Sequence, residues 1–539
     1  MIKTSPIAGQ TPGTSGLRKK TAEFMKPHFL QNYVQSIFDG IGGVKGKTFV
    51  LGGDGRYFNN EAIQIILKMA AANGMARMIV GQDGLLSTPA ASHLIKLHRT
   101  DGGLILSASH NPGGPNADFG LKYNMPNGGP ATEAVTDGIV AATQRIDRYF
   151  MVEADDIPLS SIGKFELAGM TIDVVSPTDD YIQLMSELFD FSAIRATFDG
   201  GFRMTFDAMH AITGPYAVAL FEGALGAPQG TVINAKPSPD FGGGHPDPNP
   251  VWAKELMAIM YGPDAPDFGA ASDGDGDRNM IVGPNQYISP SDSLALLAAQ
   301  AEAAPAFAAG LTGVARSMPT SGAVDRVADA KGIDCFETPT GWKFFGNLLD
   351  AGRVQLCGEE SAGTGGDHVR EKDGLWAVLL WLNILAKTKH SVSKLMEEHW
   401  ATYGRNYYTR HDYEAVPKDV ADGIMSDLRA SLNALGGQTA GALTIERVDE
   451  FSYNDPVDKS VSTGQGLRIF FDGGARAVLR LSGTGTEGAT IRVYLERLVT
   501  DADELTLDPQ VALEDVIAAT EALTGIRSKT GRDGPDVIT

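Results

Sequence analysis

Apolar and polar positions alternate along the chain with the periods of strands and helices in turn. Residues 47–53 form a short apolar run that is typical of a buried strand. Residues 60–74 carry apolar side chains at helical spacing and end in Asn-Gly, a common helix stop. Strand-like runs follow at 75–81 and 102–109. This β-α-β order predicts a mixed α/β sheet with helices on its faces.

The same alternation recurs farther along the chain. An apolar run of 12 residues at 375–386 is too short to span a bilayer of about 30 Å, so it predicts a buried helix. The last section alternates like a hairpin across residues 472–474. Strands are expected within 202–211, 267–278 and 353–363, and helices within 214–226 and 291–310.

A glycine-rich polar loop follows an apolar strand four times, at Ser109, Asp273, Glu359 and Ser482. Open α/β sheets bind ligands beyond the carboxyl ends of their strands. The four loops therefore predict one binding cleft between four domains. A Pro- and Gly-rich segment at 237–250 is either a structured loop or a flexible excursion. We expect the domains at residues 1–187, 188–290, 291–404 and 405–539.

The composition is that of a globular protein with a large acidic excess. Of the 539 residues 43% are hydrophobic, while 45 basic residues face 66 acidic ones, giving a net charge of −21. Such a charge disfavours nucleic acid and anionic membranes as partners, and we expect neither. An anionic ligand would need basic side chains gathered locally around its site.

Cysteine content and the N-terminal segment favour a reducing compartment. Cys335 and Cys357 are too few for a disulfide framework and form no metal motif, so we expect reduced thiols. Residues 1–16 contain no apolar stretch of a secretory signal. The chain is therefore expected to be a cytoplasmic enzyme.

The clearest chemical motif is DGDGDR at 273–278. Its glycines let the chain turn tightly, so Asp273, Asp275 and Asp277 can direct carboxylate oxygens at one cation. Oxygen ligands suit Mg²⁺. The spacing resembles an EF-hand loop, but Pro284 stands where that loop needs a bidentate Glu. The alternative is a solvated acidic turn, which three close carboxylates disfavour.

Ser109 is the second candidate. It lies in Ala-Ser-His-Asn-Pro, which is not the Gly-x-Ser-x-Gly elbow of a serine hydrolase. The following turn offers backbone N–H groups to an anion, and a phosphoserine would add an oxygen to the bound cation. An ordinary turn serine is the alternative, and Ser107 is a competing hydroxyl. His110 and Lys122 are either part of this chemistry or structural.

Two further loops suit a phosphosugar. Residues 480–492 resemble a phosphate cradle built from hydroxyls, backbone N–H groups and an arginine fork, although Glu487 would repel phosphate unless it points outward. A tight β-turn is the alternative. In residues 357–363, Glu359 and Ser361 alternate, so both can face the same sugar hydroxyls. The local cations that an anionic ligand needs are Arg18, Lys19, Lys20, Lys343, Arg370 and Lys372.

Five segments, in order, resemble motifs of the α-D-phosphohexomutase superfamily, and most specifically of its long phosphoglucomutases. They are SASHNPGGPNADFGLKYN, DGDGDR, TPTGWKFFGNLLDAG, CGEESAGTGGDHVREKDGLWAVL and RLSGTG. The resemblance covers most of the chain. Ser107, where threonine is usual, and Glu487, where a small neutral residue is common, depart from the family pattern.

The resemblance implies an α/β fold of three related mixed-sheet domains and a smaller C-terminal α+β domain around a central cleft. It implies roles for most of the residues singled out above. The implied catalytic residues are Ser109, His110, Lys122 and Arg278. The implied metal ligands are Ser109, as a phosphoserine, with Asp273, Asp275 and Asp277. The implied substrate-binding residues are Arg18, Thr340, Gly341, Glu359, Ser361, Lys372, Ser482, Gly483, Thr484 and Arg492.

The implied reaction is the reversible interconversion of α-D-glucose 1-phosphate and D-glucose 6-phosphate. It would use one Mg²⁺ per chain and pass through glucose 1,6-bisphosphate. The expected partner is the small phosphosugar alone, with the chain a monomer or a weak homo-oligomer. The alternatives are a phosphomannomutase or phosphoglucosamine mutase of the same superfamily, or a non-catalytic relative that keeps the fold.

Overall fold

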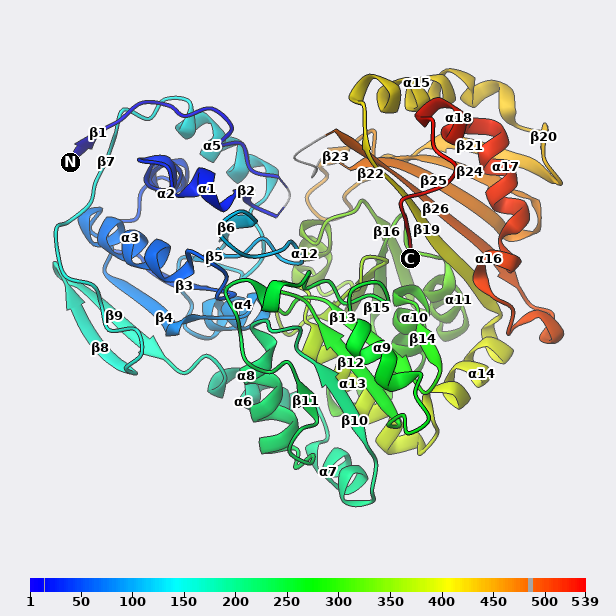
Figure 1. Ribbon diagram of the computed structural model, residues 1–539, viewed down its shortest axis with the longest axis horizontal. Coiled ribbons are helices and arrows are strands. Elements are labelled where there is room, and N and C mark those ends of the chain that lie inside the picture. The colour runs from blue at the N-terminus through cyan, green and yellow to red at the C-terminus, as the bar shows by residue number, and fades with distance from the viewer. Residues whose placement is uncertain (14, 483–487) are drawn as a thin grey trace.

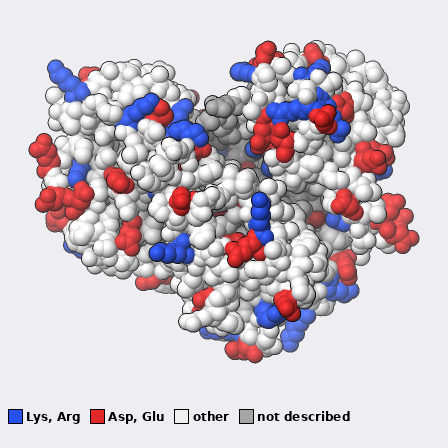
Figure 2. Space-filling model, in the orientation of Figure 1, with Lys and Arg blue, Asp and Glu red and all other residues white. Residues whose placement is uncertain are grey.

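The computed structural model describes residues 1–13, 15–482 and 488–539, which form four α/β units in chain order. Figure 1 shows the N-terminal unit in blue and cyan, the C-terminal unit in gold, orange and red opposite it, and the two mainly green units between them. This is the predicted arrangement of three mixed-sheet domains and an α+β domain. Figure 2 shows a hollow between the N-terminal and C-terminal lobes. We expect the polar loops predicted from the sequence to lie around this hollow, which we call the cleft.

The first unit contains a seven-stranded sheet in the order β2-β6-β5-β3-β4-β9-β8. Strand β3 pairs in parallel with β4 and β5, and β5 pairs antiparallel with β6. The strands are β2 (Leu17–Lys20), β3 (Thr48–Gly53), β4 (Arg77–Leu85), β5 (Gly103–Leu106), β6 (Asp118–Asn124), β8 (Gly163–Leu167) and β9 (Met170–Val175). The helices of this unit are α1 (Thr21–Phe24), α2 (Phe29–Gly40), α3 (Asn59–Ala72), α4 (Thr88–Leu97) and α5 (Glu133–Thr143).

The second unit repeats this pairing with five strands in the order β11-β10-β12-β13-β14. Strand β10 is parallel to β11 and β12, and β12 is antiparallel to β13. The strands are β10 (Met204–Asp207), β11 (Val232–Ile233), β12 (Phe268–Ser272), β13 (Asn279–Gly283) and β14 (Gln286–Ile288). The helices are α6 (Asp179–Leu188), α7 (Phe191–Asp199), α8 (Thr213–Ala217) and α9 (Lys254–Met260).

The third unit has the order β16-β15-β17-β18, with β15 parallel to β16 and β17, and β17 antiparallel to β18. The strands are β15 (Gly313–Ser317), β16 (Asp334–Thr338), β17 (Leu356–Glu359) and β18 (Gly363–Gly366). The helices are α10 (Pro290–Gln300), α11 (Ala323–Lys331), α12 (Lys343–Asp350), α13 (Gly374–Thr388) and α14 (Val392–Tyr403).

The three sheets share one strand order, and this sets where the polar loops lie. The shared order is three parallel strands followed by one antiparallel strand. In each unit the polar loop joins the last of the three parallel strands to the antiparallel strand beside it. Ser109 lies between β5 and β6, the three aspartates lie between β12 and β13, and Ser361 lies between β17 and β18. The repeat expected from the sequence is therefore a repeat of topology.

The C-terminal unit is a seven-stranded sheet in the order β20-β21-β24-β25-β26-β19-β27, with helices α15 and α17 over one face (Figure 1). All of its strand pairs are antiparallel, and β24 and β25 form the hairpin expected across residues 472–474. The strands are β19 (Arg405–Val416), β20 (Thr439–Ala440), β21 (Leu443–Glu450), β24 (Leu467–Phe471), β25 (Ala475–Ser482), β26 (Ala489–Val499) and β27 (Val537–Ile538). The helices are α15 (Lys418–Leu435), α16 (Pro509–Ala512), α17 (Glu514–Thr524) and α18 (Ile526–Thr530).

Four short strands complete the assignment, in two two-stranded sheets. They are β1 (Ile2–Lys3) with β7 (Arg148–Tyr149), and β22 (Tyr453–Asn454) with β23 (Val461–Ser462).

The apolar segment at 375–386 is confirmed as a buried helix, α13. Asp373 caps it by accepting a hydrogen bond from the backbone N–H of Trp376 at 3.1 Å. Helix α13 contacts strands of both the second and the third sheet, so it joins two units through one core. Within the described ranges, no helix combines the length and apolar character needed to cross a membrane.

Two expected helices differ from the structure. The helix expected over 291–310 ends at Gln300, and 3₁₀ turns follow. Pro305, which has no N–H and disfavours a helical conformation at Ala304, prevents the helix from continuing to 310. The helix expected over 214–226 is α-helical only through Ala217 and continues as a π-helical segment, Val218–Ala224.

Candidate active site

Ser109 lies in the turn after β5 with a positive φ of 53°, an unfavourable conformation for a residue with a side chain. Two contacts hold it there. Its N–H donates to Oγ of Ser107 at 2.7 Å, and its carbonyl accepts from Arg56 at 2.8 Å. The Ser109 hydroxyl donates to Oδ2 of Asp273 at 3.0 Å. The serine loop and the aspartate loop therefore meet at this hydroxyl.

The three aspartates of the second unit converge as the sequence predicts. One oxygen from each of Asp273, Asp275 and Asp277 lies within 4.8 Å of the others, and all three side chains are buried. Oδ1 of Asp273 also accepts the backbone N–H groups of Asp277 and Arg278, which holds the loop closed. This geometry brings three carboxylates to one point.

The carboxylates fit a hard divalent cation. Within the described part of the chain, Oδ1 of Asp275 is buried without a hydrogen-bond partner, and Oδ1 of Asp277 is buried with only the ion pair to Lys372, at 3.2 Å. Burial, followed by the charges of Asp277 and Asp275, raises the pKa of Asp273 well above its ordinary value. A divalent cation would bind the buried carboxylate oxygens and offset the repulsion between their charges. An all-oxygen donor set suits Mg²⁺.

Two lysines bring positive charge to the aspartates. Nζ of Lys372 lies 3.2 Å from Oδ1 of Asp277, and Nζ of Lys122 lies 3.8 Å from Oδ2 of Asp275. Burial alone would lower the pKa of Lys122, but Glu371, at 3.3 Å, and Asp275 outweigh it and raise that pKa. The Lys122 ammonium group is therefore charged inside the site.

Two arginines add further positive charge near the aspartates. Nε of Arg278 lies 3.8 Å from Oδ2 of Asp273, and its NH1 lies 3.5 Å from Asp247. Nε of Arg18, on β2, is buried without a partner among the described residues. The acidic chain thus gathers cations at this one place, as an anionic ligand requires.

The His110 imidazole lies beside the serine, with Nδ1 3.4 Å from Oγ of Ser109. Burial lowers its pKa well below the ordinary value, and the charges of Arg278 and Arg18 add to the effect. The imidazole is therefore neutral at neutral pH and can accept a proton.

The third unit supplies a polar wall. Glu359 ends β17, and its Oε1 accepts the backbone N–H of Gly341 at 2.9 Å. Ser361 lies in the turn before β18. The Thr340 hydroxyl is buried and has no partner among the described residues. This wall adjoins the aspartates, because a backbone bridge pairs Arg278 with Gly363.

The fourth unit contributes Arg492 on β26 and Ser482 at the end of β25. Nε of Arg492 lies 3.8 Å from Oδ2 of Asp412. The positive charge of Arg492 also contributes to the lowered pKa of His110, so it acts across the cleft. The predicted residues Gly483 and Thr484, together with Glu487, lie outside the described residues.

The structure adds residues that the sequence did not single out. Arg56 binds both oxygens of Asp54, and neither side chain is exposed to solvent. Thr88, at the start of α4, donates to Oδ2 of Asp275 at 2.7 Å. Asp54 and Arg56 follow strand β3 in a Gly-rich segment, the same pattern that located Ser109, and that pattern was available in the sequence.

The segment 237–250 is a structured loop rather than an excursion. Its Phe241 is buried under the cation of Arg56, whose Cζ lies 5.1 Å from the ring centre. The carbonyl of Pro239 accepts the backbone N–H of Tyr57 at 2.8 Å. Asp247 contacts Arg278 of the metal loop, and the ring of His245 lies 6.1 Å from that of His110, so this segment lines the serine loop as well as the metal loop.

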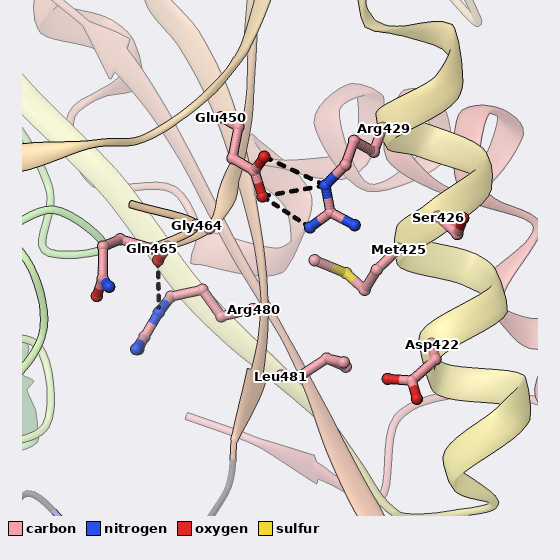
Figure 3. Close-up of a pocket in the computed structure, with 10 residues that line it drawn as sticks. Asp422, Met425, Ser426, Arg429, Glu450, Gly464, Gln465, Arg480 and Leu481 are labelled. Carbon is pink, nitrogen blue, oxygen red and sulfur yellow. Dashed lines mark hydrogen bonds and ion pairs between the residues drawn. The ribbon is translucent and has the colours of Figure 1, made fainter. Parts of the chain in front are cut away.

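A separate cavity of about 420 Å³ lies between α15 and β25 in the C-terminal unit (Figure 3). The Arg429–Glu450 ion pair, at 2.7 Å, lines one side of it, and Met425 and Leu481 line others. It contains none of the described residues that the sequence assigned to the site. This cavity therefore lies apart from the candidate active site.

Family models match the chain from one end to the other. The α/β/α domains I, II and III of phosphoglucomutase/phosphomannomutase match residues 9–150, 179–286 and 290–403. The C-terminal domain of phosphoglucomutase-1 matches residues 405–536.

Individual proteins give the same result. The chain is 57% identical to a phosphoglucomutase of Rhizobium radiobacter, with 100% of this chain and 99% of the relative covered. It is 48% identical to a cytoplasmic phosphoglucomutase of Populus tremula, with 100% and 99% covered. Other relatives are named chloroplastic. The open form of the phosphoglucomutase pp63/parafusin from Paramecium superposes with a TM-score of 0.92 at 45% identity, covering 100% of this chain and 98% of that one.

Proposed function

Since this chain belongs to the phosphoglucomutase branch of the phosphohexomutase superfamily, we propose that its phosphoglucomutase reaction runs through a phosphoryl group carried on Ser109. The single observation that supports this is the hydroxyl of Ser109 lying 3.0 Å from Asp273, within a cluster of three buried carboxylates. Burying three carboxylates lowers the stability of the fold, so we would not expect them beside a turn serine that has no chemical role.

The reaction is an isomerisation made of two phosphoryl transfers. In the first, the P–O bond to Oγ of Ser109 breaks as a bond forms to the free hydroxyl oxygen of the sugar phosphate, which gives glucose 1,6-bisphosphate. The sugar then turns around in the cleft. In the second, its other phosphate returns to Ser109, so glucose 1-phosphate and glucose 6-phosphate interconvert with no net consumption of phosphate.

Asp273, Asp275 and Asp277, with an oxygen of the Ser109 phosphate, would hold one Mg²⁺. When bound, this cation offsets negative charge on the transferred group. Arg278 and Lys372 lie against the same carboxylates and would neutralise the phosphoryl oxygens.

Two residues are candidates for the proton steps. His110 is neutral and lies next to Oγ of Ser109, so it can accept a proton from an incoming hydroxyl. Lys122 is charged and buried, so it can donate one to a leaving oxygen. Arg18, whose guanidinium group interacts with the charges of Asp275 and Asp277, would bind the phosphosugar.

The sugar and its non-reacting phosphate would be held on opposite walls. Glu359 and Ser361, with Thr340 and Gly341, would bind sugar hydroxyls. Arg492 and the loop residues Ser482, Gly483 and Thr484 would hold the distal phosphate. This second site must accept either end of the sugar, which suits a cradle of hydroxyls and backbone N–H groups.

We also propose the four domains given above, with the first boundary set before α6 (Asp179–Leu188) so that this helix stays whole in the second unit. We further propose a cytoplasmic location and a monomer or weak oligomer. The name of the Populus tremula relative supports the location, while the chloroplastic relatives show that the family is not confined to it. Light scattering of the purified protein over a concentration series tests the oligomeric state.

Intact-mass spectrometry with peptide mapping tests the serine. We expect one phosphate on Ser109, lost on incubation with excess glucose 1-phosphate, retained in Ser107→Ala and absent from Ser109→Ala. The Ser109→Ala variant should lose the mutase reaction. A phosphate on Ser107, or full activity of Ser109→Ala, would contradict the proposal.

A further inference from the structure

One face of the C-terminal sheet carries a row of charges against the third unit. Cross-strand partners share a face of a sheet, as do residues two apart on a strand. Arg410 and Asp412 on β19 are two apart, and Asp412 pairs with Arg492 on β26. These three side chains therefore lie side by side on one face.

The charges alternate in sign from the third unit to the distal phosphate site. Oε2 of Glu360 lies 3.1 Å from NH1 of Arg410, and Nε of Arg410 lies 3.1 Å from Oδ1 of Asp412. Oδ2 of Asp412 lies 3.8 Å from Nε of Arg492. The side chains of Glu360 and Asp412 are almost wholly buried, at 3% and 4% exposure, whereas Arg492 keeps 28%.

Each end of this row adjoins a residue with a proposed substrate role. Glu360 directly follows Glu359, and its backbone N–H donates to Oγ1 of Thr320 at 2.8 Å, which fixes this segment of the sugar wall. Arg492 is the proposed distal phosphate ligand. Arg410 joins the two units, because it contacts Glu360 of the third unit and Asp412 of the fourth.

We propose that Arg410 is a positioning residue that keeps Asp412 from closing on Arg492, so that Arg492 stays available to the distal phosphate. The proposal rests on the proposed phosphate-binding role of Arg492. Asp412 and a bound phosphate are rival anions for one guanidinium group. Both contacts of Asp412 are ion pairs without good hydrogen-bond geometry, but they differ in length: Nε of Arg410 lies 3.1 Å from Oδ1, whereas Nε of Arg492 lies 3.8 Å from Oδ2.

Removing Arg410 changes this competition in a defined way. Asp412 would be left as a buried carboxylate whose nearest remaining cation on this face is Arg492. It would form a close ion pair with Arg492 and so weaken phosphate binding. The effect on Arg492 passes through Asp412, so a second substitution at Asp412 should reverse it, whereas the loss of the Glu360 contact would not be reversed in this way.

The test uses four variants and the KM for glucose 1-phosphate, with inhibition by inorganic phosphate as a second measurement. Arg410→Met should raise both constants about tenfold, the value of one charged hydrogen bond. Adding Asp412→Asn to Arg410→Met should restore most of the loss, because the rival anion is gone. A residue with only a structural role would not be rescued in this way. Should Arg410→Met fold poorly in a thermal melt, Arg410→Lys gives the same test, with a smaller rise in KM expected.

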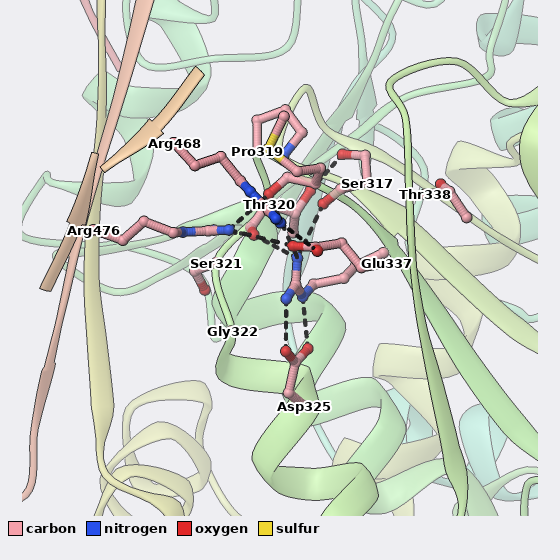
Figure 4. A network of polar contacts seen from close by, with 12 residues as sticks. Ser317, Pro319, Thr320, Ser321, Gly322, Asp325, Glu337, Thr338, Arg468 and Arg476 are labelled. Atoms are coloured by element: carbon pink, nitrogen blue, oxygen red, sulfur yellow. Dashed lines mark hydrogen bonds and ion pairs between the residues drawn. The ribbon is translucent and has the colours of Figure 1, made fainter. Parts of the chain in front are cut away.

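Arg476→Met is the matched control. Arg476 lies on the same face and also spans the two units, donating to the carbonyls of Met318 and Thr320 at 3.0 and 2.9 Å (Figure 4). It does not contact Asp412 or Arg492 in the described structure. This variant should melt at a lower temperature and keep its KM.

Arg492→Met separates this inference from the proposed function. If Arg492→Met leaves KM unchanged, the assignment of Arg492 to the distal phosphate is wrong. If Arg492→Met raises KM and Arg410→Met does not, the role of Arg410 is overturned. A rise in KM for Arg410→Met that Asp412→Asn fails to relieve also overturns it.

Discussion

The hydroxyl of Ser109 and Oδ2 of Asp273 are joined by a hydrogen bond of 3.0 Å, although 164 residues separate them in the chain. The contact requires the aspartate loop to lie directly on the serine loop. Gly274 makes this possible, because a Cβ at that position would overlap the carbonyl oxygen of Ser109. The carboxylate cluster and the proposed phosphate carrier therefore share a backbone contact that leaves no room for a side chain at position 274.

We predict that Gly274→Ala lowers kcat/KM by about a hundredfold, because the added methyl separates Ser109 from Asp273 and small displacements of reacting groups are costly. Steady-state kinetics with glucose 1-phosphate measure this. Gly346→Ala is the control, since a Cβ on Gly346 of α12 meets no atom within 4 Å. That variant should keep its activity and unfold at the same or a higher temperature, as alanine favours the helix. Equal activity of the two variants would contradict the close approach.

Arg56→Met should destabilise the protein and slow the reaction together. The Arg56–Asp54 pair is fully buried, and removing one partner of such a pair costs about 3–5 kcal/mol. Arg56 also holds the carbonyls of Ser109 and Asp118 at 2.8 Å each, so the serine loop loses its anchor. Urea unfolding measures the first effect and kcat the second. Loss of stability with unchanged kcat would show that Arg56 supports the fold but not the serine loop.

The sequence revealed the loops whose chemistry is local. Asp273, Asp275 and Asp277 lie within five residues, so their convergence follows from glycine spacing alone, and Ser109 is marked by the polar turn after a strand. The α/β alternation likewise gave the three related sheets, because each strand and helix has its own periodicity. Helix ends were less well predicted, as Pro305 and the π-helical segment after Ala217 show.

Contacts between distant segments escaped prediction for a physical reason. Arg56 reaches Ser109 over 53 residues, and Arg410 reaches Glu360 over 50. A single arginine in a strand or loop has the same local pattern whether it is solvated or buried against a carboxylate. For Arg56 the fold of its own unit decides between these outcomes, and for Arg410 the packing of the C-terminal sheet against the third unit decides.

Mg²⁺ should raise the melting temperature of the protein, and Asp277→Asn should reduce that rise. A ligand at one hundred times its Kd stabilises the folded state by about 2.7 kcal/mol. The asparagine keeps the size of the side chain but removes one of three converging charges. Thermal melts with and without MgCl₂, after treatment with EDTA, measure the shift. Asp427→Asn, whose carboxylate is exposed and paired with Lys529, is the control and should respond as the wild type does.

His399 should make the stability depend on pH below about 6.5. Burial, and secondarily the charge of Arg326, lowers the pKa of His399 to about 4 in the folded state, compared with 6.5 when unfolded. Between these values the unfolded chain binds more protons, so the free energy of unfolding falls as the pH falls. Above pH 6.5 both states are neutral and this contribution is complete. Across the window the loss from this residue is about 3 kcal/mol.

His399→Gln isolates this contribution, because glutamine does not titrate. His399 lies on α14 beside Tyr403, with their ring centres 4.9 Å apart and far along the chain from the proposed catalytic residues. Urea unfolding at pH 7 and at pH 4.5 gives the change in unfolding free energy for each protein. The wild type should lose about 2–3 kcal/mol more than the variant between these two values. Equal losses would mean that the imidazole is already protonated, or solvated, in the folded state.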